Sequence, residues 1–231
     1  MSSFASSSAA PVITVDGPSG SGKGTLCQML ARELGWHLLD SGALYRIVGL
    51  AAERDGIAFS DERELSALAA TLDVEFRPGS VGEPSTVWLS GEDISDDVRL
   101  ETTGTLASNV AIYQGVRDAL KGLQRSFAKP PGLVADGRDM GTQIFLDAPI
   151  KIYLTASAEE RAQRRYKQLI NKGENVKIAA LLEDIKARDE RDMNREVAPL
   201  RPADDAVVID STEMPIEDVL QVVLNRLKSS L

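Results

Sequence analysis

Short runs of β-branched and aliphatic residues alternate along the chain with longer stretches in which apolar residues recur every three or four positions. The short runs are typical of buried strands, and they fall at 12–15, 36–40, 133–136, 150–154 and 206–210. The periodic stretches predict helices that bury one face, and they fall at 26–34, 43–48, 61–72, 101–111, 114–128, 158–171, 177–195 and 216–227. Strands that alternate with helices indicate an α/β fold whose parallel sheet is covered on both faces.

Two helix starts carry a residue whose side-chain oxygen can accept a hydrogen bond from the first turn. Ser41 is the expected cap of the helix through 43–48, and Asp61 that of the helix over 61–72. His37, the single histidine, lies beside Trp36 in a predicted strand. We therefore interpret His37 as a strand residue, with acid–base catalysis as the alternative.

The alternation changes between 73 and 100. Residues 74–77 and 86–90 alternate apolar and polar positions, turn residues separate them, and Gly91-Glu92-Asp93 turns the chain into Ile94. This pattern predicts a small antiparallel sheet of two or three strands inserted into one main domain of residues 11–231. The insert is either a surface element with no role in binding or a cover that closes over a second ligand.

The loop after the first strand is the strongest chemical signal. Gly17-Pro18-Ser19-Gly20-Ser21-Gly22-Lys23-Gly24-Thr25 separates that strand from the first helix. Small residues let successive backbone N–H groups turn toward a polyphosphate, and the helix N-terminus adds favourable partial charge. Lys23, expected at the loop surface, can reach the terminal phosphates. An ordinary glycine-rich turn is the alternative, but the register of Gly17, Gly22 and Lys23 favours a phosphate-binding loop.

The hydroxyl that usually follows the lysine comes one position late, at Thr25, because Gly24 intervenes. We therefore expect Thr25 to contact a phosphate rather than a metal ion. Asp136 ends an apolar strand. Proteins with a phosphate-binding loop place a carboxylate near Mg²⁺ at this position, so Asp136 can hold the metal ion through a water molecule. Its alternative role is in the turn. Asp16 is a weaker metal candidate that can instead hydrogen-bond the backbone of the turn.

Charged residues gather at three further places. Arg138 and Asp139 follow a strand end as an exposed pair, which can hold a phosphate with one member and a base or sugar with the other. The alternative is a local ion pair. On one helix face Arg188, Arg191 and Arg195 surround Asp192, and this excess of guanidinium groups suits phosphates.

An earlier helix repeats the pattern with Arg161, Arg164 and Arg165. Nearby glutamates also allow a solvated surface with salt bridges there. The segment between the two helices, 168–176, is predicted to be a mobile tip.

Composition narrows the function classes. The net charge of −9 argues against a general nucleic-acid binder. No apolar run is long enough to span a membrane, and residues 1–10, rich in Ser and Ala, do not resemble a signal peptide and are expected to be a disordered tail. The single cysteine, Cys27, excludes an intrachain disulfide, fits a reducing compartment and is interpreted as a core residue.

Four motifs together resemble the bacterial cytidylate kinases, members of the P-loop nucleoside monophosphate kinases. The first motif is shared by many kinases, whereas the other three together are specific. They run in the family's order, and the resemblance covers nearly the whole chain after the tail. The motifs are 17–25, 39–46 (Leu-Asp-Ser-Gly-Ala-Leu-Tyr-Arg), 136–142 (Asp-Gly-Arg-Asp-Met-Gly-Thr) and 188–195 (Arg-Asp-Glu-Arg-Asp-Met-Asn-Arg).

The resemblance implies a three-layer P-loop kinase fold, with an insert at 73–100 that binds the monophosphate and a helical lid at 158–195. It implies phosphorylation of CMP and dCMP by ATP with Mg²⁺, in a cytoplasmic monomer with no nucleic-acid or membrane partner. The donor phosphates would lie on Gly17 to Thr25. The cytosine contacts would be Ser108, Arg117 and Asp139, and the acceptor phosphate and sugar contacts would be Ser41, Arg46, Arg138, Arg188, Asp192 and Arg195.

An acceptor that is already a phosphate oxyanion needs no general base. Catalysis must come from alignment and from charge neutralisation, which we assign to Lys23, Arg188 and Arg191 together with Mg²⁺. One alternative is a phosphotransferase that acts on another small acceptor, such as adenylate or shikimate. A second is a non-catalytic ATP-binding switch, against which the arginine-rich helix argues.

Overall fold

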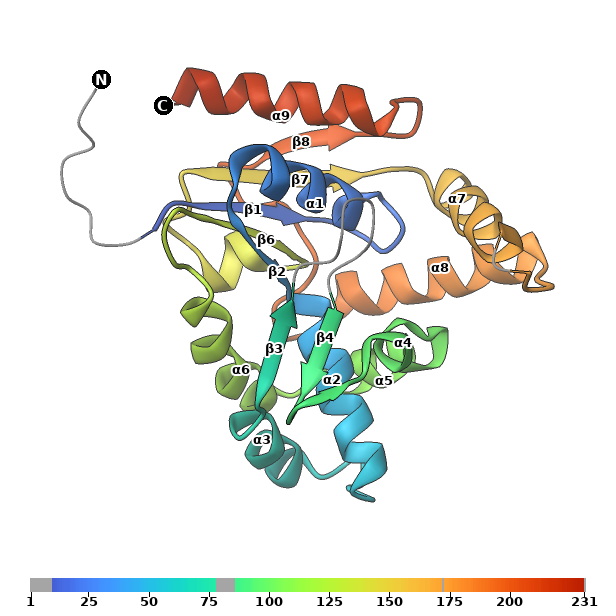
Figure 1. Ribbon diagram of the computed structural model, residues 1–231. Coiled ribbons are helices and arrows are strands. Elements are labelled where there is room, and N and C mark those ends of the chain that lie inside the picture. Colours follow the sequence, from blue (N-terminus) through green and yellow to red (C-terminus); the bar gives the residue numbers. More distant parts are fainter. Residues whose placement is uncertain (1–9, 78–85, 172, 231) are drawn as a thin grey trace.

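The computed structural model describes residues 10–77, 86–171 and 173–230. Its centre is a sheet of parallel strands in the order β2-β6-β1-β7-β8 (Figure 1). The strands are β1 (Val12–Asp16), β2 (His37–Asp40), β6 (Leu133–Gly137), β7 (Ile150–Thr155) and β8 (Val207–Asp210). The five predicted strands are therefore confirmed. Their carboxyl ends form one edge of the sheet, where ligands bind in open α/β folds.

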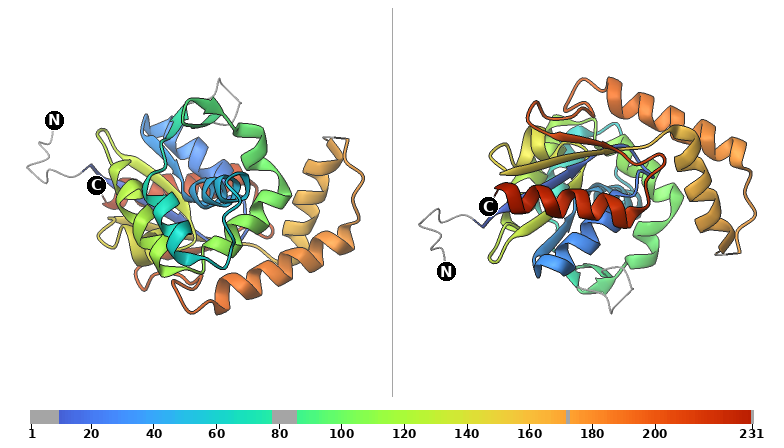
Figure 2. Two further views of the ribbon diagram at one scale, coloured as in Figure 1. Left: turned by 90° about the horizontal axis from the view of Figure 1, so that it is seen from below. Right: turned by 90° about the horizontal axis from the view of Figure 1, so that it is seen from above.

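Helices cover both faces of this sheet, as predicted (Figures 1 and 2). On one face α1 (Lys23–Leu34) and α9 (Ile216–Ser230) pack on the alternate side chains Ile13 and Val15. On the other face lie α2 (Ser41–Arg54), α3 (Glu62–Ala70), α5 (Glu101–Val110) and α6 (Gln114–Ser126), which share a second apolar core. Because side chains alternate along a strand, Thr14 and Asp16 face this second side.

The predicted insert is confirmed as an antiparallel sheet. It contains β3 (Val74–Arg77), β4 (Thr86–Leu89) and β5 (Glu92–Asp93), followed by the short helix α4 (Ser95–Arg99). Glu92 and Asp93, expected in a turn, form the third strand. The predicted turn at 78–84 and the predicted tail, apart from Ala10, lie outside the described residues.

Two helices occupy the region 158–195 that the sequence predicts to be a lid, and they are called the lid helices below for this position alone. They are α7 (Ala158–Asn171) and α8 (Ile178–Asn194), which pack against each other and stand apart from the sheet in Figure 1. Lys172, in the predicted lid tip, is not among the described residues. The lid joins the central body at the carboxyl edge of the sheet, because α7 follows β7.

One local prediction needs correction. Asp40, and not Ser41, caps α2 by accepting a hydrogen bond from the Ala43 amide at 3.1 Å, so that Ser41 becomes the first helical residue. The chain after β6 forms a π-helical turn, η1 (Met140–Ile144), for which no prediction was made from the sequence.

Three other predictions hold. Asp61 caps α3, and Cys27 is buried in the core. His37 lies at the start of β2 and donates to the Pro130 carbonyl at 2.9 Å, away from the carboxyl edge. In the described ranges, no helix combines the length and the apolar character needed to cross a membrane.

Candidate active site

The phosphate-binding loop joins β1 to α1 at the carboxyl edge of the sheet. Gly17 has φ +149°, and a Cβ atom there would lie 2.0 Å from the Leu154 carbonyl oxygen, so only glycine fits. Gly22, with φ +94°, is the N-cap residue directly before α1. Lys23 does not lie at the loop surface as expected. It is 5% exposed, and its Nζ donates to the Pro18 carbonyl at 2.9 Å, which closes the loop around the side chain.

Burial lowers the pKa of Lys23 to about 8, and the nearby Arg138 adds to this fall while Asp136 opposes it. The unliganded protein therefore loses the positive charge of Lys23 in the mildly alkaline range. A bound polyphosphate would favour the charged ammonium and raise this pKa again.

This gives a prediction for the pH dependence of the reaction. We expect kcat/KM for ATP to fall as the pH rises through about 8, because kcat/KM reports the ionisation of free Lys23. Under saturating ATP, the fall in kcat should move to higher pH. Initial rates measured between pH 6.5 and 10 test this, and a kcat/KM that stays flat across the whole range would contradict it.

A cleft of about 780 Å³ opens beside the loop. Its walls include Gly20 and Gly22 to Thr25 of the loop, the lid helix residues Arg164 and Arg165, and the segment Ser211–Ile216 after β8. The Arg164 guanidinium donates to the carbonyls of Ser21 and Ser211 and so joins the loop to that segment. Sequence reasoning did not identify 211–216, because nothing in its composition distinguishes it from an ordinary turn.

Arg161 is the main anchor of the lid. Its guanidinium forms a buried, two-pronged ion pair with Asp189 of α8, and it donates to the carbonyls of Ser19 at 3.0 Å and Ala156 at 2.9 Å. The alternative interpretation of this cluster as a solvated surface is therefore wrong for Arg161. Asp189 was not identified from the sequence, because its contact with Arg161 depends on how α7 and α8 pack together.

A second, smaller pocket of about 60 Å³ brings together the residues predicted to bind the acceptor, with the exception of Arg46. They are Ser41, Ser108, Arg117, Arg138, Asp139, Arg188, Asp192 and Arg195. Arg46 lines an adjoining cleft of about 400 Å³ together with Ser19 and Arg188. Arg188 belongs to both cavities, so the acceptor pocket is continuous with the phosphate loop through this side chain.

The prediction that Arg138 and Asp139 form an exposed pair is wrong. Asp139 is 3% exposed and forms its ion pair with Arg117 of α6, whose guanidinium also lies over the Tyr45 ring at 5.5 Å. Arg138 instead pairs with Asp192 at 3.1 Å. Neighbours in the sequence thus point to different partners, because the chain enters η1 at this position and turns Asp139 toward α6.

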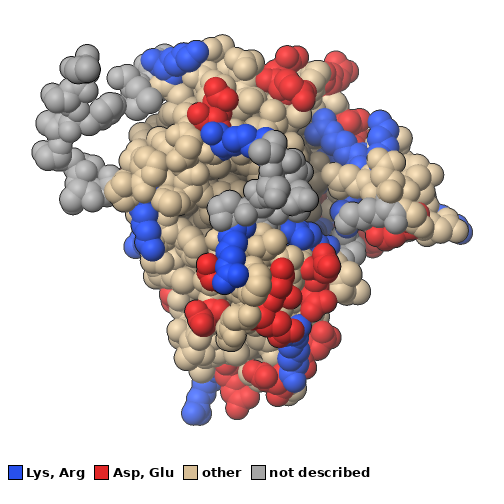
Figure 3. Space-filling model, viewed as in Figure 1, with Lys and Arg blue, Asp and Glu red and all other residues tan. Residues whose placement is uncertain are grey.

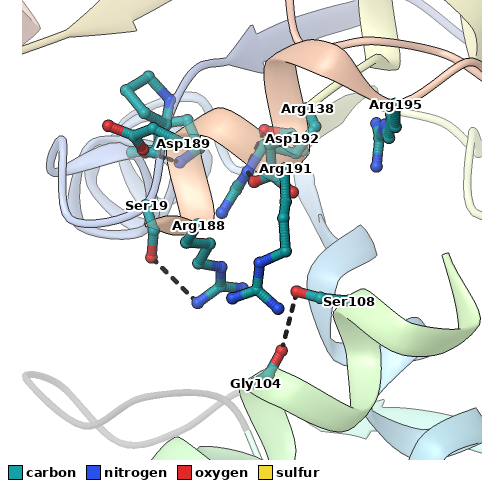
Figure 4. Close-up of polar contacts among 12 residues, drawn as sticks. Ser19, Gly104, Ser108, Arg138, Arg188, Asp189, Arg191, Asp192 and Arg195 are labelled. Carbon is teal, nitrogen blue, oxygen red and sulfur yellow. Dashed lines mark hydrogen bonds and ion pairs between the residues drawn. The ribbon is translucent and has the colours of Figure 1, made fainter. Parts of the chain in front are cut away.

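Arg188 and Arg191 of α8 extend toward α5 across the site (Figure 4), whereas Asp189 and Asp192 of the same helix pair with Arg161 and Arg138. The Arg188 Nη1 lies 3.4 Å from Ser19 Oγ, and the exposed Arg191 donates from Nε to its own helix at Ala187. In the same close-up, the Arg188 and Arg191 side chains both extend toward the helix that carries Ser108; Arg188 lines two of the cavities described above, whereas Arg191 lines none of these three. On the opposite wall, Arg46 donates to the carbonyls of Val98 and Leu100, both at 2.8 Å.

Charge is distributed unevenly around these cavities. In Figure 3 acidic side chains gather over the lower part of the molecule, whereas Lys and Arg side chains border the hollow that faces the lid. The arginines that line the cavities are Arg46, Arg99, Arg117, Arg138, Arg164, Arg165, Arg188 and Arg195. A protein of net charge −9 therefore concentrates its cations where phosphates would bind.

Carboxylates at the ends of the strands decide whether a divalent cation fits. Burial raises the pKa of Asp136 to about 6, and Asp40, its neighbour across the β2–β6 pair, adds to the rise while Lys23 opposes it. No cluster of three His, Cys, Asp or Glu side chains suited to a metal ion occurs in the described ranges. Mg²⁺ fits this site, because it is commonly held by one or two carboxylates, water and the phosphates of the substrate. Asp40 was not identified from the sequence as a member of this group.

Asp16 is engaged by the backbone of a neighbouring turn. Both of its carboxylate oxygens accept backbone amides, from Met140 and Gly141, at 2.8 Å each. The alternative interpretation, that Asp16 hydrogen-bonds backbone groups of a turn, is confirmed. The turn is the one after β6, however, and not the phosphate-binding loop that follows Asp16.

Comparison with known proteins agrees with this geometry. The family profile described as "Cytidylate kinase" matches residues 13–229. The chain is 58% identical over 225 residues to the cytidylate kinase of Pseudomonas entomophila (strain L48), covering 97% of each chain. It is 57% identical over 224 residues to that of Pseudomonas putida (strain W619), covering 97% of this chain and 96% of the relative.

A third relative, the cytidylate kinase of Pseudomonas fluorescens (strain SBW25), is 56% identical over 218 residues, which cover 94% of this chain and 95% of the relative. The matched residues include the phosphate loop, the insert, the acceptor pocket and the lid helices. This chain therefore belongs to the cytidylate kinase family.

Proposed function

We propose that this protein transfers the γ-phosphoryl group of ATP to CMP and dCMP, giving ADP with CDP or dCDP. The observation that carries the proposal is the continuity of the two sites: Arg188 lines the acceptor pocket and also faces Ser19 of the phosphate loop. An acceptor phosphate held by Arg188 would therefore lie beside the end of the donor polyphosphate. Membership of the cytidylate kinase family supports cytidine nucleotides as the acceptors.

The donor would bind along the loop, with Thr25 and the amides of Gly17 to Thr25 on its phosphates and Lys23 on the terminal ones. Mg²⁺, when bound, neutralises phosphate charge, and Asp136 with Asp40 would hold it, directly or through water. Arg188 and Arg191 add positive charge from the lid side (Figure 4). Because the acceptor attacks through a phosphate oxygen, these residues need only align the groups and stabilise the charge of the transferring phosphoryl.

The acceptor base would be read by the buried pair of Arg117 and Asp139, with Ser108 beside them. A carboxylate accepts a hydrogen bond from the exocyclic amine of cytosine, whereas uracil has a carbonyl at that position. Ser41, Arg46, Arg138, Asp192 and Arg195 would hold the sugar and the phosphate. We further propose that the enzyme works as a cytoplasmic monomer in pyrimidine nucleotide metabolism, which the single buried cysteine fits.

The test is a panel of acceptors measured with ATP and Mg²⁺. CMP and dCMP should give the highest kcat/KM, with UMP, AMP, GMP and shikimate far lower. A higher value for another acceptor would replace the proposed substrate, and the absence of turnover with every acceptor would favour the non-catalytic ATP-binding switch.

One prediction concerns Arg191. We expect Arg191→Ala to lower kcat by about 100-fold while KM for CMP stays within about twofold, because Arg191 meets charge that develops only in the transition state. Steady-state kinetics with varied CMP separate the two parameters. Lys186→Ala removes another exposed cation of α8, one that pairs with Glu159, and should leave both parameters unchanged. A raised KM with normal kcat would refute this role.

A further inference from the structure

Asp16 is a buried carboxylate that the mechanism above does not use. It is the last residue of β1, directly before Gly17, and it is 4% exposed. Its Oδ1 accepts the Met140 amide and its Oδ2 the Gly141 amide, each at 2.8 Å. Burial raises the pKa of Asp16 to about 7, and the hydrogen bonds from Gly141 and Met140 oppose this rise, so the two amides lower the cost of burying the carboxylate.

The geometry around Asp16 brings η1 directly onto the sheet. β1 lies between β6 and β7, with Asp16 paired to Gly137 and Tyr153. Gly141 approaches so closely that a Cβ atom there would lie 3.1 Å from Thr14 Oγ1 and 3.1 Å from Lys151 Cδ. Because Gly141 has no side chain, its amide can reach Asp16. We call the contact of Asp16 with the Met140 and Gly141 amides the seat of the turn.

This seat lies one residue from the base-reading carboxylate. Asp139 directly precedes Met140 and Gly141, and its carbonyl accepts the Gln143 amide at 2.9 Å. Its side chain is held by Arg117 on the other side. The direction of the Asp139 carboxylate therefore depends on where the Met140 and Gly141 amides are fixed.

We propose that Asp16 is a positioning residue for selection of the acceptor base, which acts by fixing the turn that presents Asp139 to cytosine. This inference rests on the proposed function, because it deepens the role of the same acceptor pocket. It also gives β1 two roles at one end: Gly17 opens the donor loop, and Asp16, one residue earlier, holds the acceptor turn.

Asp16→Asn is the direct test. The asparagine has one acceptor oxygen, and its NH₂ group would face the second amide as another donor, so one of the two hydrogen bonds is lost. A displaced turn should raise KM for CMP and lower the CMP:UMP ratio of kcat/KM by about 100-fold. KM for ATP should stay within about twofold.

Thr14→Val is the matched control. Thr14 lies on the same strand and the same face as Asp16, is fully buried, and touches the position of Gly141, but its hydroxyl has no hydrogen-bond partner among the residues that the structure describes. The valine variant should keep the CMP:UMP ratio. Equal losses in both variants would show that any disturbance under the turn has this effect, and they would overturn a specific role for Asp16.

A spectroscopic readout separates this inference from the proposed function. The Met140 side chain is fully buried, so its methyl resonance, assigned with Met140→Leu, reports the position of the turn without any substrate. Asp16→Asn should shift it, and Thr14→Val should not. If the wild type prefers a different acceptor, the proposed function fails while this resonance still tests the seat.

An unchanged resonance together with an unchanged CMP:UMP ratio in Asp16→Asn would overturn the proposal. Should that variant not fold, Gly141→Ala tests the same seat from the side of the turn, and it should lower the ratio in the same way.

Discussion

Replacing Lys23 by methionine is expected to lower kcat for phosphoryl transfer by at least about 100-fold, a loss of ~3 kcal/mol of transition-state stabilisation. The ammonium is the cation of the loop that can reach the terminal phosphates, and methionine keeps most of the buried volume while removing the charge. Alanine should lose as much activity and also some stability, because Lys23 is buried and its removal leaves space within the loop.

The measurements are steady-state rates with ATP and CMP, together with thermal unfolding of each variant. Lys186→Met serves as the matched control, because Lys186 is an exposed lysine of α8 and should be replaced without loss. Near-normal turnover in a folded Lys23→Met protein would contradict the assignment of the phosphate loop.

The alternating strands and helices could be predicted because each follows from a local pattern. The run from Val12 to Val15 and the helical spacing after Lys23 depend only on neighbouring residues, and the structure has both elements. The edge at which the site forms also follows, because parallel strands place their carboxyl ends together. Which residue caps α2 does not follow, since both Asp40 and Ser41 can cap a helix and only the backbone angles decide between them.

The pairing of side chains in the site could not be predicted from the sequence. Arg138 and Asp139 are neighbours, yet their partners come from α8 and α6, which are distant along the chain. The burial of Arg161 is a similar case, because the same cluster of charges suits a solvated surface until α8 places Asp189 against it. Tertiary packing determines these contacts, and no local pattern encodes them.

The last prediction concerns selection of the base by Asp139. A site built around a hydrogen bond rejects an analogue that lacks the partner, in favourable cases by roughly 10⁴. We expect Asp139→Asn to lose CMP activity and to narrow the CMP:UMP ratio of kcat/KM by at least about 100-fold, because the amide removes the charge and can donate to the uracil carbonyl. The variant also leaves Arg117 as a buried cation without its counter-charge, so some stability should be lost.

The ratio of specificity constants is therefore the informative measurement, since a partly unfolded preparation lowers both rates alike and leaves their ratio intact. Asp118→Asn is the matched control: it removes an exposed carboxylate next to Arg117 on α6, one that accepts a hydrogen bond from Gln114 at 2.7 Å. Its CMP:UMP ratio should equal that of the wild type. If Asp139→Asn also keeps the ratio, Asp139 does not read the base, and its role is to neutralise Arg117 within the pocket.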